Sequence, residues 1–400
     1  MQTTVMIGDC LEKLKELPDE SVNTCVTSPP YWGLRDYGVS NQLGLEDTPE
    51  EFVDNLVKVF REVKRVLRSD GTLWLNLGDS YANQRSGEGA DTLKNLNVNT
   101  HGYKNPTEKQ EKTNKNFNQR LNFGNLKQKN LLGLPWRVAL ALQQDDWYLR
   151  QDIIWHKPNP MPESVKDRCT KAHEYIFLLS KSPKYYFDSE SIKEDAIYSP
   201  STTKEVERPK GYYKGKYSKP EKANRVDGSF KAIRSKKNKR SVWSVSPKPF
   251  KDAHFATFPM KLIEPCILAG CPEKVCVDCG TPYEQKVETK RIPRWELPED
   301  DKRYRPKKYE NAHDKLNGST RDHITETKII GLQKKCNCQT NKTKGGTVLD
   351  IFGGSGTTGI VANSHERDSI LIELNKDYVN IMKKRFNDEL GLFSKLKILN

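Results

Sequence analysis

The sequence predicts an α/β protein built on a doubly wound, mostly parallel sheet. Short apolar runs of strand character alternate with helical patterns, which is the order expected of parallel strands joined by crossover helices. A glycine-rich turn also follows a buried strand at residues 347–352 and leads into a helix. In such sheets, ligands bind beyond the carboxyl ends of the strands. The residues that follow each strand are therefore the first candidates for function.

Hydrophobic periodicity predicts the elements in order. In the first part of the chain, strands are expected at 3–7, 22–26 and 73–77, and helices at 11–17 and 49–67. The longer helix has the clearest apolar face, at Phe52, Leu56, Val59, Phe60, Val63 and Leu67. Gly71 and Thr72 are expected to turn into the third strand. Later strands are expected at 149–155, 175–179, 347–352 and 369–374, and later helices at 137–144, 260–269 and 359–364.

The segment Thr27-Ser28-Pro29-Pro30-Tyr31 follows the second strand. Its two prolines fix two φ angles and remove two N–H donors, so the turn is stiff and presents acceptors. The Ser28 hydroxyl and the Pro29 carbonyl can take the N–H bonds of an exocyclic amine on a nucleobase, which frees the nitrogen lone pair. Tyr31 can hold the base by stacking. The structural alternative is an ordinary Pro-Pro turn with Tyr31 as packing.

The second candidate is the run of residues 353–358, Gly-Gly-Ser-Gly-Thr-Thr, between a strand and a helix. Such a turn lets the backbone approach a ligand closely. The next strand ends in Glu373, 23 residues after Asp350 (373 − 350), close to the spacing at which an acid meets a ribose. The pattern is not that of a dinucleotide site and has no phosphate-binding lysine. It favours a different nucleoside cofactor.

The two turns together resemble those of amino-group DNA methyltransferases that use S-adenosylmethionine. Residues 350–357 resemble that family's cofactor motif, Asp-Pro-Phe-x-Gly-Ser-Gly-Thr, with Ile351 in place of the proline. Residues 27–31 resemble its catalytic motif. Because the catalytic motif comes first along the chain, the order matches the circularly permuted β-type of the family. The resemblance covers roughly 1–82, 131–190 and 241–390.

The resemblance implies a Rossmann-like methyltransferase core and a base flipped out of double-stranded DNA. It assigns catalysis to Ser28, Pro29, Pro30 and Tyr31, and cofactor binding to Asp9, Asp350, Phe352, Gly353, Gly354, Gly356, Thr357, Thr358 and Glu373. In this family a serine before Pro-Pro-Tyr is associated with cytosine N4, and an aspartate or asparagine with adenine N6. Cytosine N4 is therefore favoured. Adenine N6 methylation is one alternative, and a zinc-containing DNA-binding protein with a degenerate methyltransferase core is another.

The chain is expected to divide into five parts. These are a catalytic part at 1–190 with a mobile loop at 83–130, a target-recognition segment at 191–250, a core helix within 251–272, a Cys-rich insertion at 273–340 and a cofactor-binding part at 341–400. Residues 204–250 hold 15 Lys and Arg against four acids, with three tyrosines among them. That composition favours DNA recognition over a solvated linker.

Four cysteines form a candidate metal site. Cys276 and Cys279 are a Cys-x2-Cys pair followed by glycine, and Cys336 and Cys338 follow 57 residues later (336 − 279). Four thiolates at such spacings can close a tetrahedral zinc-ribbon-like site. The intervening segment is polar, so a structural zinc would help it fold. Free reduced thiols are the alternative.

Composition agrees with a DNA partner. The formal charge is +14, which favours a polyanion. No apolar run approaches 18 residues and no signal segment opens the chain, so we expect a cytoplasmic protein without membrane contact. A cognate restriction endonuclease is a partner that the family allows, and the sequence does not define the oligomeric state. Asp9 and Asp79 are also expected to cap helices, and His156 and His173 are equally open to structural or active-site roles.

Overall fold

A computed structural model of the chain describes residues 1–33, 42–82, 122–123, 126–195, 236–247, 258–301, 304, 323–391 and 395–399. The chain divides into two units, which we describe separately. One comprises Met1–Pro272 and Gly346–Asn400, and the other comprises Glu273–Gly345. The expected loop at 83–130 falls mostly outside the described residues, as does most of the expected recognition segment.

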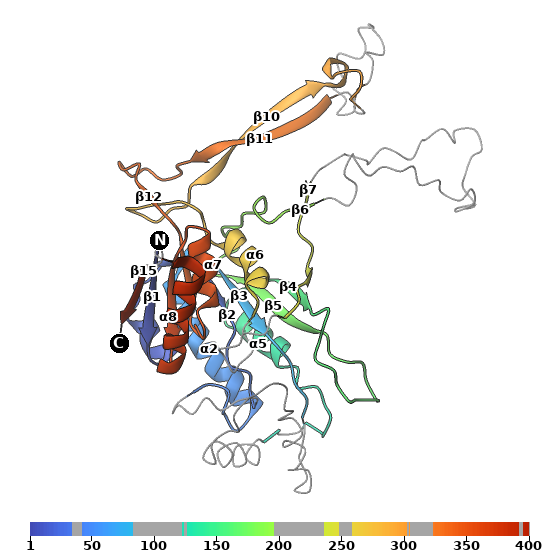
Figure 1. The fold of residues 1–400 in the computed structure, drawn as a ribbon, viewed down its shortest axis with the longest axis vertical. Coiled ribbons are helices and arrows are strands. Elements are labelled where there is room, and N and C mark those ends of the chain that lie inside the picture. The colour runs from blue at the N-terminus through green and yellow to red at the C-terminus, as the bar shows by residue number, and fades with distance from the viewer. Residues whose placement is uncertain are drawn as a thin grey trace, which may run out of the picture. The chain divides into compact units, whose positions relative to one another are not determined.

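The larger unit contains a nine-stranded sheet in the order β15-β1-β14-β13-β2-β3-β5-β4-β8 (Figure 1). Neighbouring strands are parallel except at β3–β5 and β5–β4, where β5 runs antiparallel. The expected fold class, a mostly parallel α/β sheet, is confirmed. The strands are β1 (Gln2–Ile7), β2 (Val22–Thr27), β3 (Leu67–Leu77), β4 (Tyr148–His156), β5 (His173–Ser180), β8 (Val242–Ser244), β13 (Thr347–Asp350), β14 (Asp368–Glu373) and β15 (Lys395–Leu399).

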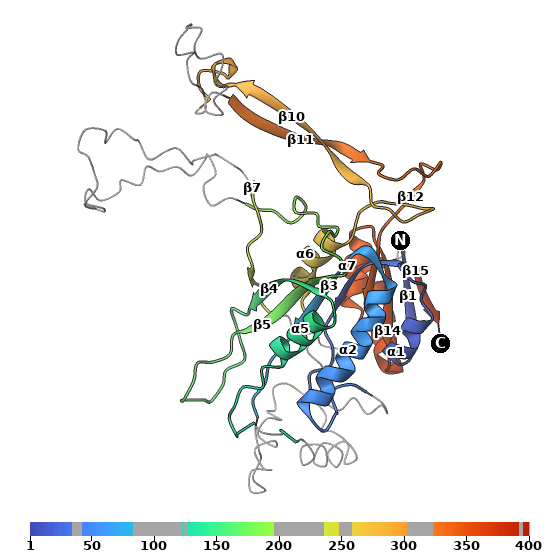
Figure 2. The same cartoon turned by 180° about the vertical axis from the view of Figure 1, so that it is seen from behind.

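Helices cover both faces of this sheet. On one face α1 (Cys10–Lys15) contacts α2 (Pro49–Val66), which contacts α5 (Leu134–Gln144). On the other, α7 (Thr357–Ser364) contacts both α6 (Met260–Gly270) and α8 (Lys376–Leu390). Figure 1 shows α6, α7 and α8 over one side and Figure 2 shows α1, α2 and α5 over the opposite side. Successive residues of β2 pack into the hydrophobic cores on opposite faces of the sheet. Cys25 packs into the core on the α2 side, and Val26 packs into the core on the α6 side.

Local sequence explains where these helices begin. Thr48 caps α2 by accepting a bond from the Glu51 amide, and Pro49 occupies the first turn, where no N–H is needed. Asp9 caps α1 as expected, because it accepts from the amides of Leu11 and Glu12. Asp79 also caps a helix, but one distant in sequence: it accepts from Gly133 and Leu134 at the start of α5.

Some elements differ from the expectation. The turn expected at Gly71 and Thr72 is a bulge inside β3, because Val22 pairs with Leu67 whereas Thr24 pairs with Thr72. The sequence patterns did not indicate α8, or the edge strands β8 and β15. The core helix expected within 251–272 is α6. None of the described helices is long and apolar enough to cross a membrane.

The smaller unit is built around a two-stranded antiparallel ribbon that the sequence patterns did not indicate. It consists of β10 (Glu284–Pro293) and β11 (His323–Gln333), with a short 3-10 helix at Arg294–Glu296. At its base, β9 (Val275–Cys276) pairs with β12 (Thr343–Lys344). Pro272 and Gly346 are the residues of the larger unit that border the smaller one in the chain. They lie next to each other, because the Gly346 amide donates to the Pro272 carbonyl at 3.1 Å.

Candidate active site and its surroundings

The carboxyl ends of five adjacent parallel strands bring the expected site residues to one edge of the sheet. The strands are β1, β14, β13, β2 and β3 in that order. They end at or just before Asp9, Glu373, Asp350, Ser28 and Asp79, respectively. The two turns singled out from the sequence follow β13 and β2, which are neighbours in the sheet. Segments more than 300 residues apart in sequence therefore meet at this edge, as the fold class predicts.

Asp350 joins the two turns. Its side chain is buried, and Oδ1 accepts from Thr27 Oγ1 at 2.7 Å and from the Phe352 amide at 3.1 Å. Oδ2 accepts from Thr358 Oγ1 at 2.6 Å. Burial raises the pKa of Asp350, while these hydrogen bonds oppose the rise. The carboxylate thus supports the glycine turn from beneath and ties it to the residue just before Ser28.

The glycine turn has a shape that only glycine adopts without strain. Gly354 and Gly356 have φ of 50° and 81°, in the left-handed region. A Cβ on Gly356 would lie 2.5 Å from Met382 Cγ and 2.9 Å from Phe386 Cε2, both on α8. A Cβ on Gly354 would meet only the Phe352 carbonyl, at 3.8 Å. The outer side of the turn at Gly354 is therefore open to a ligand, whereas Gly356 packs inward.

Arg385 holds the same turn from α8. It is buried, and its Nη1 donates to Ser355 O at 3.0 Å, Ser355 Oγ at 2.6 Å and Thr357 Oγ1 at 2.9 Å. Burial lowers its pKa, although Glu389 opposes this. Thr357 and Thr358 point inward to Arg385 and Asp350. Only the backbone of these two threonines is therefore available to a ligand at the turn. No sequence pattern indicated that their side chains support the turn from inside.

Glu373 is placed to bind polar groups at this edge. Its Oε2 accepts from the Gly354 amide at 2.7 Å and its Oε1 from the Asn375 amide at 2.8 Å. Burial raises its pKa to about 6, against the effect of those two bonds. The adjacent strand β1 places Asp9 close by, because Ile7 pairs with Glu373 and the Gly8 amide donates to the Glu373 carbonyl at 3.0 Å. Both acids therefore lie on the β14 side of the glycine turn, with Glu373 next to it.

The catalytic turn contacts a charged cluster formed by Glu174 and Lys157, the neighbours of the two candidate histidines. Tyr31 Oη donates to Glu174 Oε2 at 2.8 Å, and the other oxygen of Glu174 accepts from Lys157. Asn76 Nδ2 reaches the same Oε2 at 3.4 Å. Burial and the Glu174 charge raise the pKa of Tyr31 well above its usual value, so the phenol is neutral. The sequence signal for Lys157 and Glu174 was their position next to His156 and His173, but the contact with Tyr31 had no signal of its own.

Gly78 leaves room for the Tyr31 ring. A Cβ at that position would lie 2.6 Å from Tyr31 Cε2 and 3.3 Å from Glu174 Cδ. Pro29 is buried, and Ser28, Pro30 and Tyr31 are half-buried. Lys171 donates to the Asp79 carbonyl, and burial lowers the pKa of this lysine. The four predicted catalytic residues therefore form a rigid, partly accessible turn with cationic groups beside it.

The two histidines make structural contacts. His156 Nδ1 lies 3.0 Å from Ser244 Oγ on the neighbouring strand β8. His173 Nε2 lies 3.4 Å from Tyr175 Oη, and the two rings meet edge-on at 5.3 Å between centroids. Of the two roles left open for each histidine, the structural one has these contacts in its support.

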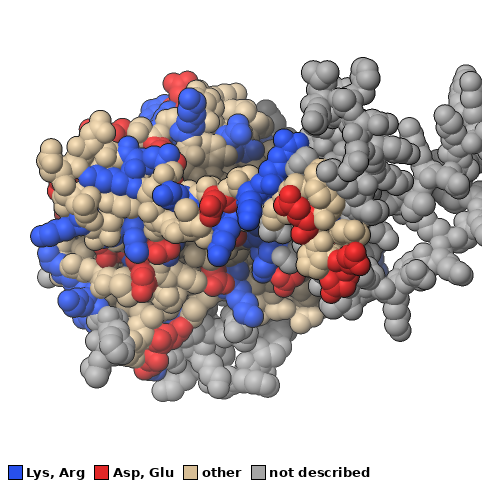
Figure 3. All heavy atoms as spheres, turned by 90° about the horizontal axis from the view of Figure 1, so that it is seen from above, with Lys and Arg blue, Asp and Glu red and all other residues tan. Residues whose placement is uncertain are grey.

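The described part of the basic segment forms a neck. Glu194–Asp195 (β6) pairs with Lys236–Lys237 (β7), so the chain on either side of 196–235 is held together. Lys236 pairs with Asp195 at 2.8 Å, and three further basic residues lie within 4 Å of Glu194: Lys237, Lys239 and Arg240. On the face drawn in Figure 3, described Lys and Arg residues lie among acids rather than in one continuous patch. Lys231 and Arg234 fall outside the described residues.

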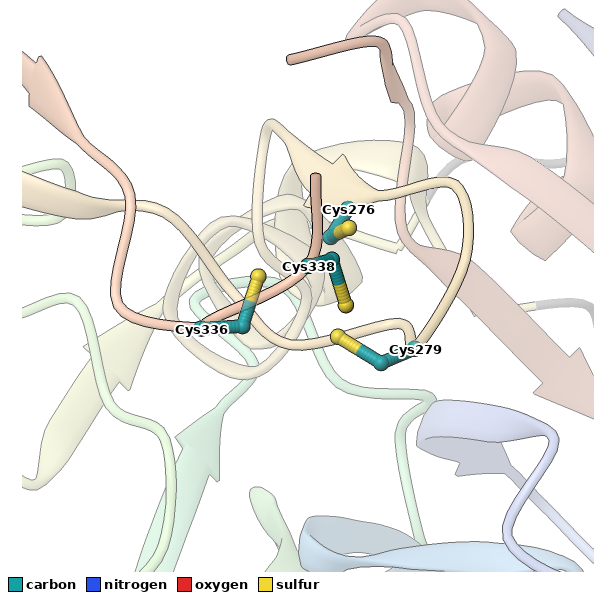
Figure 4. Close-up of side chains that lie close together, drawn as sticks. All are labelled: Cys276, Cys279, Cys336 and Cys338. Carbon is teal, nitrogen blue, oxygen red and sulfur yellow. The ribbon is translucent and has the colours of Figure 1, made fainter. Parts of the chain in front are cut away.

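The predicted metal ligands converge in the smaller unit. The Sγ atoms of Cys276, Cys279, Cys336 and Cys338 all lie within 4.8 Å of one another, and their side chains point toward a common centre (Figure 4). All nine cysteines of the chain are free thiols in the structure. Cys266 and Cys271 are buried in the larger unit, inside α6 and just after its end.

A family model described as DNA methylase matches residues 22–279 and 285–384. The chain belongs to this DNA methylase family. It is thus a DNA methyltransferase of the N4/N6 class, with both turns inside the matched residues.

Among its relatives, Type II methyltransferase M.Cfr9I from Citrobacter freundii is 36% identical over 96% of this chain and 88% of the relative. M.SmaI from Serratia marcescens is 36% identical over 95% of this chain and 89% of the relative. A solved PvuII DNA methyltransferase has 16% identity over 99% of this chain and 95% of that chain, with a TM-score of 0.49.

Proposed function

We propose that this DNA methyltransferase transfers a methyl group from S-adenosylmethionine to the exocyclic N4 amine of cytosine in duplex DNA. The observation that carries the proposal is the link through Asp350. One carboxylate accepts from Thr27, next to Ser28, and from Thr358 at the start of the helix after the glycine turn. The acceptor turn and the nucleoside-type turn are thereby held in one frame. Positioning two reactants in line supplies most of the rate gain in such transfers.

The residues at the glycine turn fit S-adenosylmethionine, which supplies an electrophilic methyl group on a sulfonium. Glu373 takes one backbone bond per oxygen, and a carboxylate can accept about four, so it keeps capacity for ribose hydroxyls. Asp9 lies at the adenine end, while still capping α1. Gly354 allows close backbone approach. We assign Asp350, Thr357 and Thr358 to the support of this turn, because their side chains are bonded inside the protein.

The target amine would be held by Ser28 and Pro29. The Ser28 hydroxyl and the Pro29 carbonyl accept its two N–H bonds, so the nitrogen lone pair is free to attack. Tyr31, fixed by Glu174, provides the stacking face. Direct attack needs no enzyme nucleophile. Consistent with this, burial raises the pKa of Cys10 to about 12 and that of Cys25 well above its usual value, so neither thiol is a ready thiolate.

The choice of cytosine N4 over adenine N6 rests on Ser28. The test is nucleoside analysis by mass spectrometry of plasmid DNA from cells that express the protein, with Ser28→Ala as the matched control. N4-methylcytosine should appear with the wild type and fall at least tenfold with the variant. N6-methyladenine would overturn the base assignment while leaving the enzyme class. Unmodified DNA together with no measurable cofactor binding would favour a degenerate core.

We further propose that residues 191–250 recognise the DNA sequence. The neck formed by β6 and β7 supports this, because the pairing of Asp195 with Lys236 joins the two ends of residues 196–235, which hold most of the basic residues of the segment. A cytoplasmic site of action follows from a DNA substrate. Because two close relatives are Type II methyltransferases, a restriction endonuclease of the same specificity is the partner we propose for the cell.

A further inference from the structure

Four thiols of the smaller unit meet without any disulfide between them. Cys276 belongs to β9, Cys279 follows it in a tight turn, and Cys336 and Cys338 follow the end of β11. Every pair of their sulfur atoms lies within 4.8 Å (Figure 4). In a tetrahedral site with zinc–sulfur bonds of about 2.3 Å, the sulfur atoms are about 3.8 Å apart. A contraction of at most about 1 Å between any two sulfur atoms would reach that geometry.

We propose that these four cysteines bind one structural zinc ion, which holds together the base of the β10–β11 ribbon. The set is closed, because four thiolates fill a tetrahedron and leave no position for water or substrate. The ion therefore stabilises the unit and takes no part in methyl transfer.

The backbone around the cysteines is already shaped for the ion. Gly280 has φ of 69°, a left-handed value, and its amide donates to the Cys276 carbonyl at 2.9 Å, which closes the turn between the first two ligands. Thr343, near the C-terminal end of the unit, pairs with Cys276 between β12 and β9. This pairing holds the backbone of the first ligand in place. Lys334 donates to the carbonyls of Cys338 and Thr340 and so braces the second pair.

Charge also favours this assignment. Four thiolates and a divalent ion carry a net charge of −2, so a nearby cation lowers the cost of forming the site. Lys334 places its ammonium at the Cys338 carbonyl, and Lys335, which pairs with Glu284 at 2.9 Å, is the next residue. Thiolate ligands in tetrahedral arrangement select zinc over the hard cations, which prefer oxygen.

The ribbon explains why the unit needs the ion. Most β10 side chains are exposed, and Val287, Ile329 and Ile330 remain about half exposed. A two-stranded ribbon with no core of its own is marginally stable in water. The ligand pairs flank its open end, since β10 begins at Glu284 after Cys279 and β11 ends at Gln333 before Cys336. One ion there closes a loop of about 57 residues (336 − 279).

The test measures metal content and ribbon order, and neither depends on methyltransferase activity. Full-length protein purified under reducing conditions should carry about one zinc per chain by mass spectrometry. Cys276→Ser should lose that zinc and increase backbone hydrogen exchange at least tenfold in 284–293 and 323–333. Cys169→Ser is the matched control, since Cys169 is an exposed thiol outside the cluster. It should retain both the metal and the slow exchange.

A second arm avoids reliance on the folding of a variant. A strong zinc chelator added to the wild type should raise the same exchange rates, and added zinc should restore them. Zinc-free protein that takes up no zinc, with four readily alkylated thiols and slow exchange in the ribbon, would overturn the proposal. So would a bound iron with visible thiolate absorption, or a disulfide within the tetrad.

Discussion

At the scale of single residues, the catalytic turn depends on a partner from β5, two strands away in the sheet. Tyr31 follows β2, whereas Glu174 lies at the start of β5, and 143 residues separate them. Glu174 accepts from the phenol with one oxygen and from Lys157 with the other. It touches no reacting atom. We therefore regard it as a positioning residue that fixes how the Tyr31 ring faces a flipped base.

Tyr31→Phe and Glu174→Gln should each lower kcat about 5- to 30-fold, with the cofactor Kd unchanged. The reason is that Tyr31→Phe removes the hydrogen bond that orients the ring, and the neutral glutamine weakens it, with an effect of about 1–2 kcal/mol. If Glu174 acts through the Tyr31 hydroxyl, the double variant should be no slower than the slower single variant. Glu62→Gln, which breaks a half-exposed pair with Arg65 on α2, is the control and should leave kcat unchanged. Fully additive losses would remove Glu174 from this role.

Glu373 predicts a pH dependence of cofactor binding. Its pKa is raised to about 6 by burial, from an ordinary value of 4.5. The carboxylate form accepts ribose hydroxyls, so the cofactor Kd should be constant above about pH 7 and rise toward tenfold per pH unit below about 6. Glu373→Gln should weaken binding about 10- to 100-fold at pH 8 and remove that dependence. Calorimetry between pH 5 and 8 measures both. A wild-type Kd that stays flat over this range would exclude Glu373 from the site.

The raised pKa of Glu373 affects folding stability in the opposite direction to cofactor binding, because stability falls as the pH rises. Because the folded-state pKa lies above the ordinary value, the protonated carboxyl favours the folded state. This contribution is fully present below about pH 4.5 and is lost as the pH rises through about 6. The protein therefore retains a charged, partly desolvated carboxylate at neutral pH, at a cost in stability that cofactor binding can offset.

At the scale of elements, α8 determines the shape of the glycine turn. It contributes Arg385 to the turn from below, and its Met382 and Phe386 fill the space that a side chain at Gly356 would need. The start of α5 offers a comparison. Gly133 has a similar left-handed backbone, with φ of 69° against 81° at Gly356, but its Cβ position has no neighbour within 4 Å.

Gly356→Ala and Gly133→Ala should therefore differ. Gly133→Ala should lower the free energy of unfolding by about 1 kcal/mol, which is the cost of holding an alanine in a left-handed backbone conformation. Gly356→Ala should cost roughly 1–3 kcal/mol more, because the added carbon overpacks the contact with α8, and it should also weaken cofactor binding. Denaturant unfolding and calorimetry on both variants measure this. Equal losses of stability would show that α8 yields to the extra atom and does not hold the turn.

At the scale of the whole molecule, the basic residues of 204–250 fall into two groups, those beside the β6–β7 neck and those outside it. Lys236, Lys237, Lys239 and Arg240 are already paired with Glu194 or Asp195. They close the neck and have less charge to offer DNA than their number suggests. The remaining cations of 204–250, Lys231 and Arg234 among them, are the better candidates for phosphate contacts.

Replacing Lys231 and Arg234 together by alanine should weaken DNA binding and reduce the slope of log K against log salt by up to about 1.8, because each phosphate contact contributes about 0.9. The cofactor Kd should not change. Lys15→Ala with Lys58→Ala removes the same charge from exposed positions on α1 and α2, and should leave the slope unaltered. Fluorescence anisotropy at several salt concentrations measures it. Identical slopes for both double variants would make residues 204–235 a linker.

Patterns local in the chain predicted the strands β1, β2, β13 and β14, the helix α2 and the two turns at the sheet edge. This succeeded because strand and helix periods, two prolines or three glycines act within a few residues. The fold class then placed Ser28, Asp350 and Glu373 on one edge, since parallel strands share their direction. The cysteine pairs were also recognisable, because thiol ligands come at short spacings.

Other features arise only when distant segments pack together. The pairing of Tyr31 with Glu174, the capping of α5 by Asp79 and the support of the glycine turn by Arg385 join residues 143, 55 and 30 apart. None has a periodic signal, because a side-chain hydrogen bond depends on where two backbones lie in space. The ribbon likewise depends on cross-strand pairing of two exposed segments. The sequence by itself therefore determined the chemistry that the site edge carries, and the tertiary structure decided which residues hold that chemistry in place.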